Sequence, residues 1–220
     1  MPFFPVSLSE LFALRWRRRV FFCLLLLLAP SLLLIGAIIV CPSGQCGLPA
    51  TDQAVMRWAS TLREPWLDEV MRRITWAGSL LVLVPIAFLQ AYRCFKQLGW
   101  LKALWAPVAI VGATGIAQAF KWWLDRPRPQ ELPVIDLPID PSFPSAHTMQ
   151  ITALVFTLLW IGRTRAYGLW MVAIVLIVLV GFSRIYLGVH FFTDVLLGAA
   201  AGLAWAWALR YIYQGEGEIR

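Results

Sequence analysis

The two histidines of this chain each stand in a short polar segment that interrupts long apolar stretches. His190 lies in "SRIYLGVHFFTD", with Arg184 six residues before it and Asp194 four residues after it. An imidazole can act as a nucleophile, and a carboxylate one helical turn away can reach it and hold its tautomer. This spacing predicts that His190 is an activated nucleophile and that Asp194 orients it.

Cationic side chains could form an anion site beside His190. Lys121 and Arg128 both lie in the segment "KWWLDRPRP". Ammonium and guanidinium groups bind phosphoryl oxygens well. Arg184 and His190 would lie on different sides of an unbroken helix, and Gly188 permits the break that brings them together. These residues therefore predict a site for a phosphoryl group.

The segment "FPSAH" adds backbone donors to this set. Ser145 is a typical N-cap for the apolar stretch that follows, so the N–H groups of Ala146 and His147 would point outward at the positive end of a helix. An isolated histidine is as often structural as chemical, but two histidines beside several cations favour chemistry. The sequence has no carboxylate cluster with metal-ligand spacing, so we expect no metal and no other cofactor.

The composition determines the class of protein that must carry these residues. The chain has 220 residues, of which 60% are hydrophobic and 14% charged, and its mean hydropathy is +0.72. These values exclude an ordinary soluble domain and predict an all-α integral membrane protein. Six apolar stretches are each about long enough to cross a hydrocarbon core of ~30 Å. The expected transmembrane helices are 20–40, 74–92, 103–120, 146–162, 166–183 and 191–209.

The basic residues predict the orientation of these helices. Four arginines precede the first apolar stretch, namely Arg15, Arg17, Arg18 and Arg19. The positive-inside rule then places the N-terminus in the cytoplasm, and six crossings return the C-terminus there. The motif segments would all emerge on the outer side. The net charge of +7 agrees with this topology and with contact to anionic lipid, and no stripe of basic and aromatic residues suggests a nucleic-acid partner.

The chain is expected to form a single membrane-embedded domain over residues 1–220. Residues 1–19 would form an interfacial helix or, equally, a simple stop at the membrane edge. The outer loop 41–73 contains helical spacing interrupted by Pro65 and is expected to form two short surface helices. Cys41 and Cys46 in this loop could pair in an oxidising compartment, a question that the spacing leaves open. The second outer loop, 121–145, carries the motif residues.

These motifs resemble those of the type 2 phosphatidic acid phosphatase superfamily, the membrane relatives of the vanadium haloperoxidases. "KWWLDRPRP" matches K-x6-R-P, "PSAH" is similar to P-S-G-H, and "SRIYLGVHFFTD" matches S-R-x5-H-x3-D in full. The resemblance covers roughly residues 70–210, and three motifs in order are far more specific than one. Ala146 stands where the family usually has glycine. The backbone N–H is kept, but the added methyl group affects how closely the backbone can approach a substrate.

The resemblance implies a role for each motif residue. His190 would be the nucleophile, Asp194 its orienting carboxylate and His147 the general acid. Ser183 and Pro144 match the motifs but are expected to be structural. The residues implied to bind phosphate are Lys121, Arg128, Ser145, Ala146 through its amide, and Arg184.

The expected activity is therefore metal-independent hydrolysis of a lipid phosphate or diphosphate through a phosphohistidine, on the outer side of a bacterial inner membrane. Undecaprenyl diphosphate, a carrier for cell-wall biogenesis, is the first expectation. Phosphatidylglycerol phosphate, phosphatidic acid and lipid A phosphates follow. A lipid phosphotransferase could use the same residues. A non-catalytic scaffold or transporter would keep the spans but lose a histidine or an arginine, and none is lost here. Membrane lipids are the expected partners, with no obligate protein partner.

Overall fold

The structure, a computed structural model, describes residues 8–130 and 133–215, and all regular elements in these ranges are helices. Short elements are η1 (Pro42–Gly44), α2 (Ala50–Thr61), α3 (Pro65–Trp76) and α5 (Trp100–Ala103). The longer helices are α1 (Leu8–Val40), α4 (Leu80–Leu98), α6 (Trp105–Leu124), α7 (Ala146–Ile161), α8 (Tyr167–Tyr186) and α9 (Phe192–Gly215). The prediction of an all-helical protein is confirmed for these ranges.

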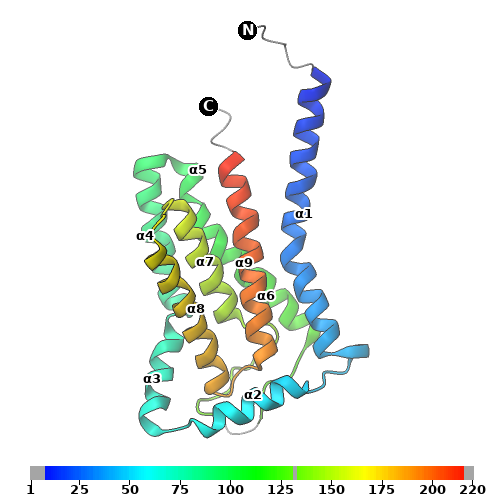
Figure 1. Ribbon diagram of the computed structural model, residues 1–220, viewed down its shortest axis with the longest axis vertical. Helices are drawn as coiled ribbons and strands as arrows, with labels where there is room; N and C mark the ends of the chain where they lie inside the picture. The colour runs from blue at the N-terminus through cyan, green and yellow to red at the C-terminus, as the bar shows by residue number, and fades with distance from the viewer. Residues whose placement is uncertain (1–7, 131–132, 216–220) are drawn as a thin grey trace.

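The longer helices lie side by side along the long axis, and α2 lies across one end of the bundle (Figure 1). The start of α1 and the end of α9 lie at the opposite end (Figure 1). Helices in five segments of the described chain are long and apolar enough to cross a membrane: Cys23–Val40, Pro65–Leu98, Trp100–Leu124, Tyr167–Tyr186 and Phe192–Tyr211. The expected span at 146–162 corresponds to α7, which is apolar but has 16 residues.

Residues 41–73 contain the two expected short helices, α2 and α3, and Pro65 is the first residue of α3. The expected start of the second span at residue 74 is wrong, because α3 continues to Trp76 and a turn follows. α4 begins at Leu80 after Ser79, whose hydroxyl accepts a hydrogen bond from the Leu81 amide at 3.3 Å. Cys41 and Cys46 form a disulfide beside η1.

Two further boundaries differ from the expectation. The first helix begins before the expected start at residue 20, because α1 runs without interruption from Leu8 to Val40; residues 1–7 lie outside the described part. α6 continues one turn past the expected end at residue 120, so Lys121 lies on a helix and not in the motif loop. The charged residue Lys121 ends the uncharged stretch without ending the helix, which is why the expected boundary falls short of the structural one.

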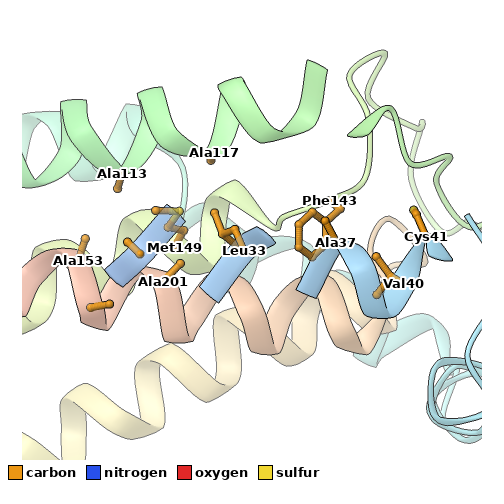
Figure 2. Packing of buried hydrophobic residues seen from close by; sticks show 12 residues of the cluster. Leu33, Ala37, Val40, Cys41, Ala113, Ala117, Phe143, Met149, Ala153 and Ala201 are labelled. Atoms are coloured by element: carbon orange, nitrogen blue, oxygen red, sulfur yellow. The ribbon is translucent and has the colours of Figure 1, made fainter. Parts of the chain in front are cut away.

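The packing of α7 against α9 determines where the motif residues meet. The cluster between α1, α6, α7 and α9 is rich in alanine, including Ala113, Ala117, Ala153 and Ala201 (Figure 2). Small side chains let helix backbones approach closely. At Gly202 a Cβ atom would lie 2.4 Å from the Met149 carbonyl oxygen, so these two helices are in near backbone contact.

Candidate active site

The segment between α8 and α9 presents His190. α8 ends at Tyr186, and Gly188 has a φ of 73°, a left-handed conformation that favours glycine. The carbonyl of Arg184 accepts hydrogen bonds from the amides of Val189 at 3.2 Å and His190 at 3.3 Å. The predicted break at Gly188 is therefore confirmed, and it folds His190 back against the end of α8.

Asp194 lies beside His190, although the two residues are not one turn apart on the same helix. His190 precedes α9, which begins at Phe192, whereas Asp194 is in its first turn. The Asp194 Oδ2 atom lies 3.5 Å from His190 Nδ1 and accepts hydrogen bonds from the Phe191 amide at 2.9 Å and from the Ser142 hydroxyl. The predicted pair is thus brought together, with the geometric reason corrected. His190 Nδ1 has no hydrogen-bond partner within the described ranges.

Lys121 and Arg128 converge on one carboxylate, that of Asp140. The Lys121 ammonium lies 3.1 Å from Asp140 Oδ2, and Arg128 donates to Asp140 Oδ1 at 2.8 Å. Burial raises the pKa of Asp140, but the charges and hydrogen bonds of the two cations outweigh that effect and hold the pKa below its usual range. Asp140 is therefore ionised and forms ion pairs with the two cations that were predicted to bind phosphate.

Arg128 joins this cation pair to the predicted nucleophile. Its Nη1 atom donates to the Val189 carbonyl at 2.6 Å and lies 3.3 Å from His190 Nε2. A guanidinium has no acceptor, so His190 Nε2 must be the acceptor in this contact and the ring proton lies on Nδ1, toward Asp194. This is the tautomer that a nucleophilic Nε2 requires.

The remaining motif residues lie around the same place. Arg184 donates to the Thr75 hydroxyl of α3 at 2.8 Å. His147 is the second residue of α7 and lies against the turn between α3 and α4, where a Cβ atom at Gly78 would lie 3.1 Å from the His147 Cβ. The amides of Ala146 and His147 lie in the first turn of α7 and have no acceptor within that helix.

Ser145 occupies the N-cap position of α7, but its side chain does not cap the helix. The hydroxyl is buried and lies 3.0 Å from the Thr148 hydroxyl, and it makes no hydrogen bond to a first-turn amide. The predicted side-chain cap is therefore wrong. The Ser145 amide instead donates to the Asp194 carbonyl at 3.0 Å, which ties the start of α7 to the start of α9.

The electrostatic environment keeps His190 neutral. Burial is the largest effect that lowers the pKa of His190 well below its usual value, and nearby charges lower it further. The cations that act in this direction are Lys121, Arg128 and Arg184, and His147 adds to the effect. A neutral imidazole is the form that can attack an electrophile.

Sequence reasoning missed three buried or half-buried residues of this site, Asp52, Arg126 and Asp140. Arg126 lies two residues before Arg128 in the same motif segment, and Asp140 lies shortly before "FPSAH", so both had a positional signal. Asp52 had none, since it lies in a different outer segment. An open cavity of about 250 Å³ adjoins the loop and is lined by Arg126, Arg128 and Asp140 among others.

Comparisons with known proteins show the family of the chain. Residues 102–218 match the sequence model of the PAP2 superfamily. The chain is 34% identical over 184 residues to phosphatidylglycerophosphatase B of Bacillus subtilis (strain 168), a match that covers 79% of this chain and 88% of that protein. It is 35% identical over 83 residues to an undecaprenyl-diphosphatase of Sulfolobus acidocaldarius, covering 38% of each.

Two solved structures share the fold. A transmembrane PAP2-type phosphatidylglycerolphosphate phosphatase of Bacillus subtilis superimposes with a TM-score of 0.74 at 27% identity, covering 88% of this chain and 98% of that one. LpxE of Aquifex aeolicus superimposes with a TM-score of 0.57 at 26% identity, covering 71% and 93%. The chain belongs to the PAP2 superfamily. It is a membrane phosphatase, a hydrolase of phosphate or diphosphate esters.

Proposed function

We propose that this phosphatase removes a phosphate from a membrane lipid through a phosphohistidine at His190. One observation carries the proposal. Arg128 contacts both His190 Nε2 and the Asp140 carboxylate, and Asp140 also lies on Lys121. The Asp140 carboxylate thus binds the cations that adjoin the nucleophilic nitrogen. A phosphoryl group bound in its place would lie next to His190.

The proposed reaction has two steps. His190 Nε2 attacks phosphorus and the ester P–O bond breaks, while His147 donates a proton to the departing oxygen. Water then attacks the phosphohistidine with His147 as base, which releases phosphate and restores the neutral imidazole. Positioned cations stabilise the phosphoryl oxygens throughout, and this is the largest part of phosphoryl-transfer catalysis. The proposed phosphate-binding groups are Lys121, Arg128, Arg184, Ser145 and the Ala146 amide.

We further propose that α7 also crosses the membrane and that the site faces the outer side of a bacterial inner membrane. Sixteen helical residues extend over about 24 Å, slightly less than the hydrocarbon core. Arg93 and Lys96 lie near the end of α4 and Lys102 lies in α5, at the end opposite the site. Arg165 lies between α7 and α8 at the same end. The positive-inside rule favours that end as cytoplasmic.

Phosphatidylglycerol phosphate is the proposed substrate. The sequence led us to expect undecaprenyl diphosphate first, but the Bacillus phosphatidylglycerophosphatase matches 79% of the chain and the undecaprenyl-diphosphatase 38%. The second match keeps prenyl diphosphate as the other candidate. Both substrates have the long apolar tail that a site at the lipid boundary requires.

The test is phosphate release by the purified protein in detergent, with excess EDTA, from phosphatidylglycerol phosphate, undecaprenyl diphosphate and phosphatidic acid. We expect turnover with EDTA, the highest kcat/KM on phosphatidylglycerol phosphate, and acid-labile phosphate on the protein that His190→Ala removes. Retained turnover in His190→Ala, or loss on chelation that magnesium restores, would refute the histidine mechanism. A higher kcat/KM on undecaprenyl diphosphate would instead reassign the substrate.

A further inference from the structure

Arg126 is a buried cation that lies next to the proposed catalytic pair. Its side chain is 1% exposed. One arm of the guanidinium, Nη1, donates to Asp194 Oδ1 at 2.5 Å and to the Thr193 hydroxyl at 2.9 Å. The other arm, Nη2, donates to Asp52 Oδ2 at 2.8 Å. Arg126 thus bridges two buried carboxylates.

Asp52 brings the outer helix α2 into this arrangement. Its carboxylate is fully buried and accepts hydrogen bonds from the Thr193 amide at 2.9 Å and the Thr193 hydroxyl at 2.7 Å. Thr193 lies in the first turn of α9, where unpaired amides and the helix dipole favour an anion. The residue that satisfies this helix start therefore comes from a segment 141 positions earlier in the chain.

We propose that Arg126 and Asp52 are positioning residues for the phosphatase reaction, which act on His190 through Asp194. The inference rests on the proposed roles of His190 and Asp194. Arg126 fixes Oδ1 of Asp194, while Ser142 and the Phe191 amide fix Oδ2. With both oxygens held, Oδ2 faces His190 Nδ1 in one orientation and can accept its proton as positive charge develops on the ring.

A purely structural role predicts different behaviour from a positioning role. A buried ion pair is weak support for stability, but removing one partner leaves an uncompensated buried charge and destabilises the fold. Destabilisation lowers the amount of active enzyme. Misplacement of Asp194 lowers the rate constant of the chemical step in every folded molecule. The two effects separate in a single-turnover experiment.

The experiment is rapid-quench measurement of phosphoenzyme formation at saturating substrate in detergent. The first-order rate constant is independent of the folded fraction, which affects only the amplitude. We expect Arg126→Gln to lower this rate constant about 10- to 100-fold, because misplacement by about 1 Å has effects of that size. Asp52→Asn should also lower this rate constant. Arg126→Lys should not restore it, because an ammonium group cannot bridge two carboxylates as a guanidinium does. Arg57→Gln, an exposed arginine of α2, is the control and should leave it unchanged.

A double-mutant cycle shows whether Arg126 acts through Asp194. In an Asp194→Asn background, Arg126→Gln should lower the rate constant little further, because the group that it positions is already altered. A full multiplicative loss in that background, or variants that lower the amplitude alone, would overturn the inference while His190→Ala remains inactive. Turnover in His190→Ala would refute the proposed function itself. If Arg126→Gln does not fold, Asp52→Asn and its own cycle with Asp194→Asn decide the question.

Discussion

At the residue scale, the loss of activity on replacing His147 should depend on the leaving group of the substrate, whereas the loss on replacing His190 should not. His190→Ala should abolish turnover on every substrate. His147→Ala should cost more where the departing oxygen needs a proton. A prenyl diphosphate releases a phosphate monoester, whose second pKa is ~6, whereas phosphatidylglycerol phosphate releases an alkoxide comparable to hydroxide from water, with a pKa of ~15.7.

General acid catalysis contributes roughly 10²- to 10⁴-fold, so His147→Ala should lose about that much more phosphoenzyme-formation rate on phosphatidylglycerol phosphate than on a prenyl diphosphate. The rate must be measured by rapid quench, because His147 is also the proposed base in the second step. Equal losses on the two substrates would show that His147 is not the acid.

The neutral state of His190 makes a second prediction at this scale, about pH. Burial and the surrounding cations lower the pKa of His190 in the folded protein, whereas the unfolded chain has the ordinary value of ~6.5. Below that value the unfolded state binds more protons than the folded state, so the free energy of unfolding should fall as the pH decreases from about 6.5.

Histidine-labelled protein makes this visible by NMR, since the chain has just two histidines. In a His147→Asn variant the His190 ring nitrogens should keep neutral chemical shifts as the pH passes below ~6.5. Half-protonation near that value would contradict the buried, cation-flanked environment.

At the element scale, the loop that follows α6 should compete with the substrate. Asp140 lies on Lys121 and Arg128, which a phosphoryl group would also occupy. Asp140→Asn should therefore lower the inhibitory concentration of inorganic phosphate or vanadate by about tenfold, equivalent to roughly 1.4 kcal/mol. Asp136→Asn, at an exposed position of the same loop, is the matched control. Weaker inhibition in Asp140→Asn would mean that the carboxylate holds the cations in place and does not compete.

The contact between α7 and α9 makes a prediction about stability. At Gly202 a Cβ atom would lie 2.4 Å from the Met149 carbonyl oxygen and 3.0 Å from the Thr152 Cβ, so Gly202→Ala must separate the two helices. Overpacking of this kind costs about 1–3 kcal/mol. We expect a lower thermal midpoint in detergent for Gly202→Ala. Gly115→Ala on α6, where a Cβ atom would meet nothing within 4 Å, should have no such effect. An unchanged midpoint for Gly202→Ala would show that α7 and α9 are not in tight contact.

At the scale of the whole molecule, the orientation in the membrane can be tested by labelling. Asp136→Cys lies in the loop beside the site, and Arg165→Cys lies between α7 and α8 at the other end. In a background without Cys23, the first should react with an impermeant thiol reagent in intact spheroplasts and the second only after permeabilisation. The reverse pattern would place the site in the cytoplasm.

The sequence by itself determined the class of protein and placed the candidate site residues in three motifs. Hydropathy and length are local properties, so the order and approximate position of the apolar helices could be predicted, although α1 begins twelve residues earlier and α4 six residues later than expected. Three motifs of fixed spacing pointed to His147, His190 and Asp194 as candidate site residues. Such residues can be found from sequence because each lies in a short motif and the motifs follow one another in a fixed order along the chain. The helix break at Gly188 could be predicted for the same local reason.

Tertiary structure alone decided which groups face one another. Asp140 met Lys121 through the course of a loop, and Asp52 reached Arg126 and the start of α9 through the placement of α2. Hydrogen bonds and ion pairs are short-range, so contacts between segments far apart in the chain have no periodicity or spacing that a single sequence displays. They exist only where the packing of the helices brings the segments together.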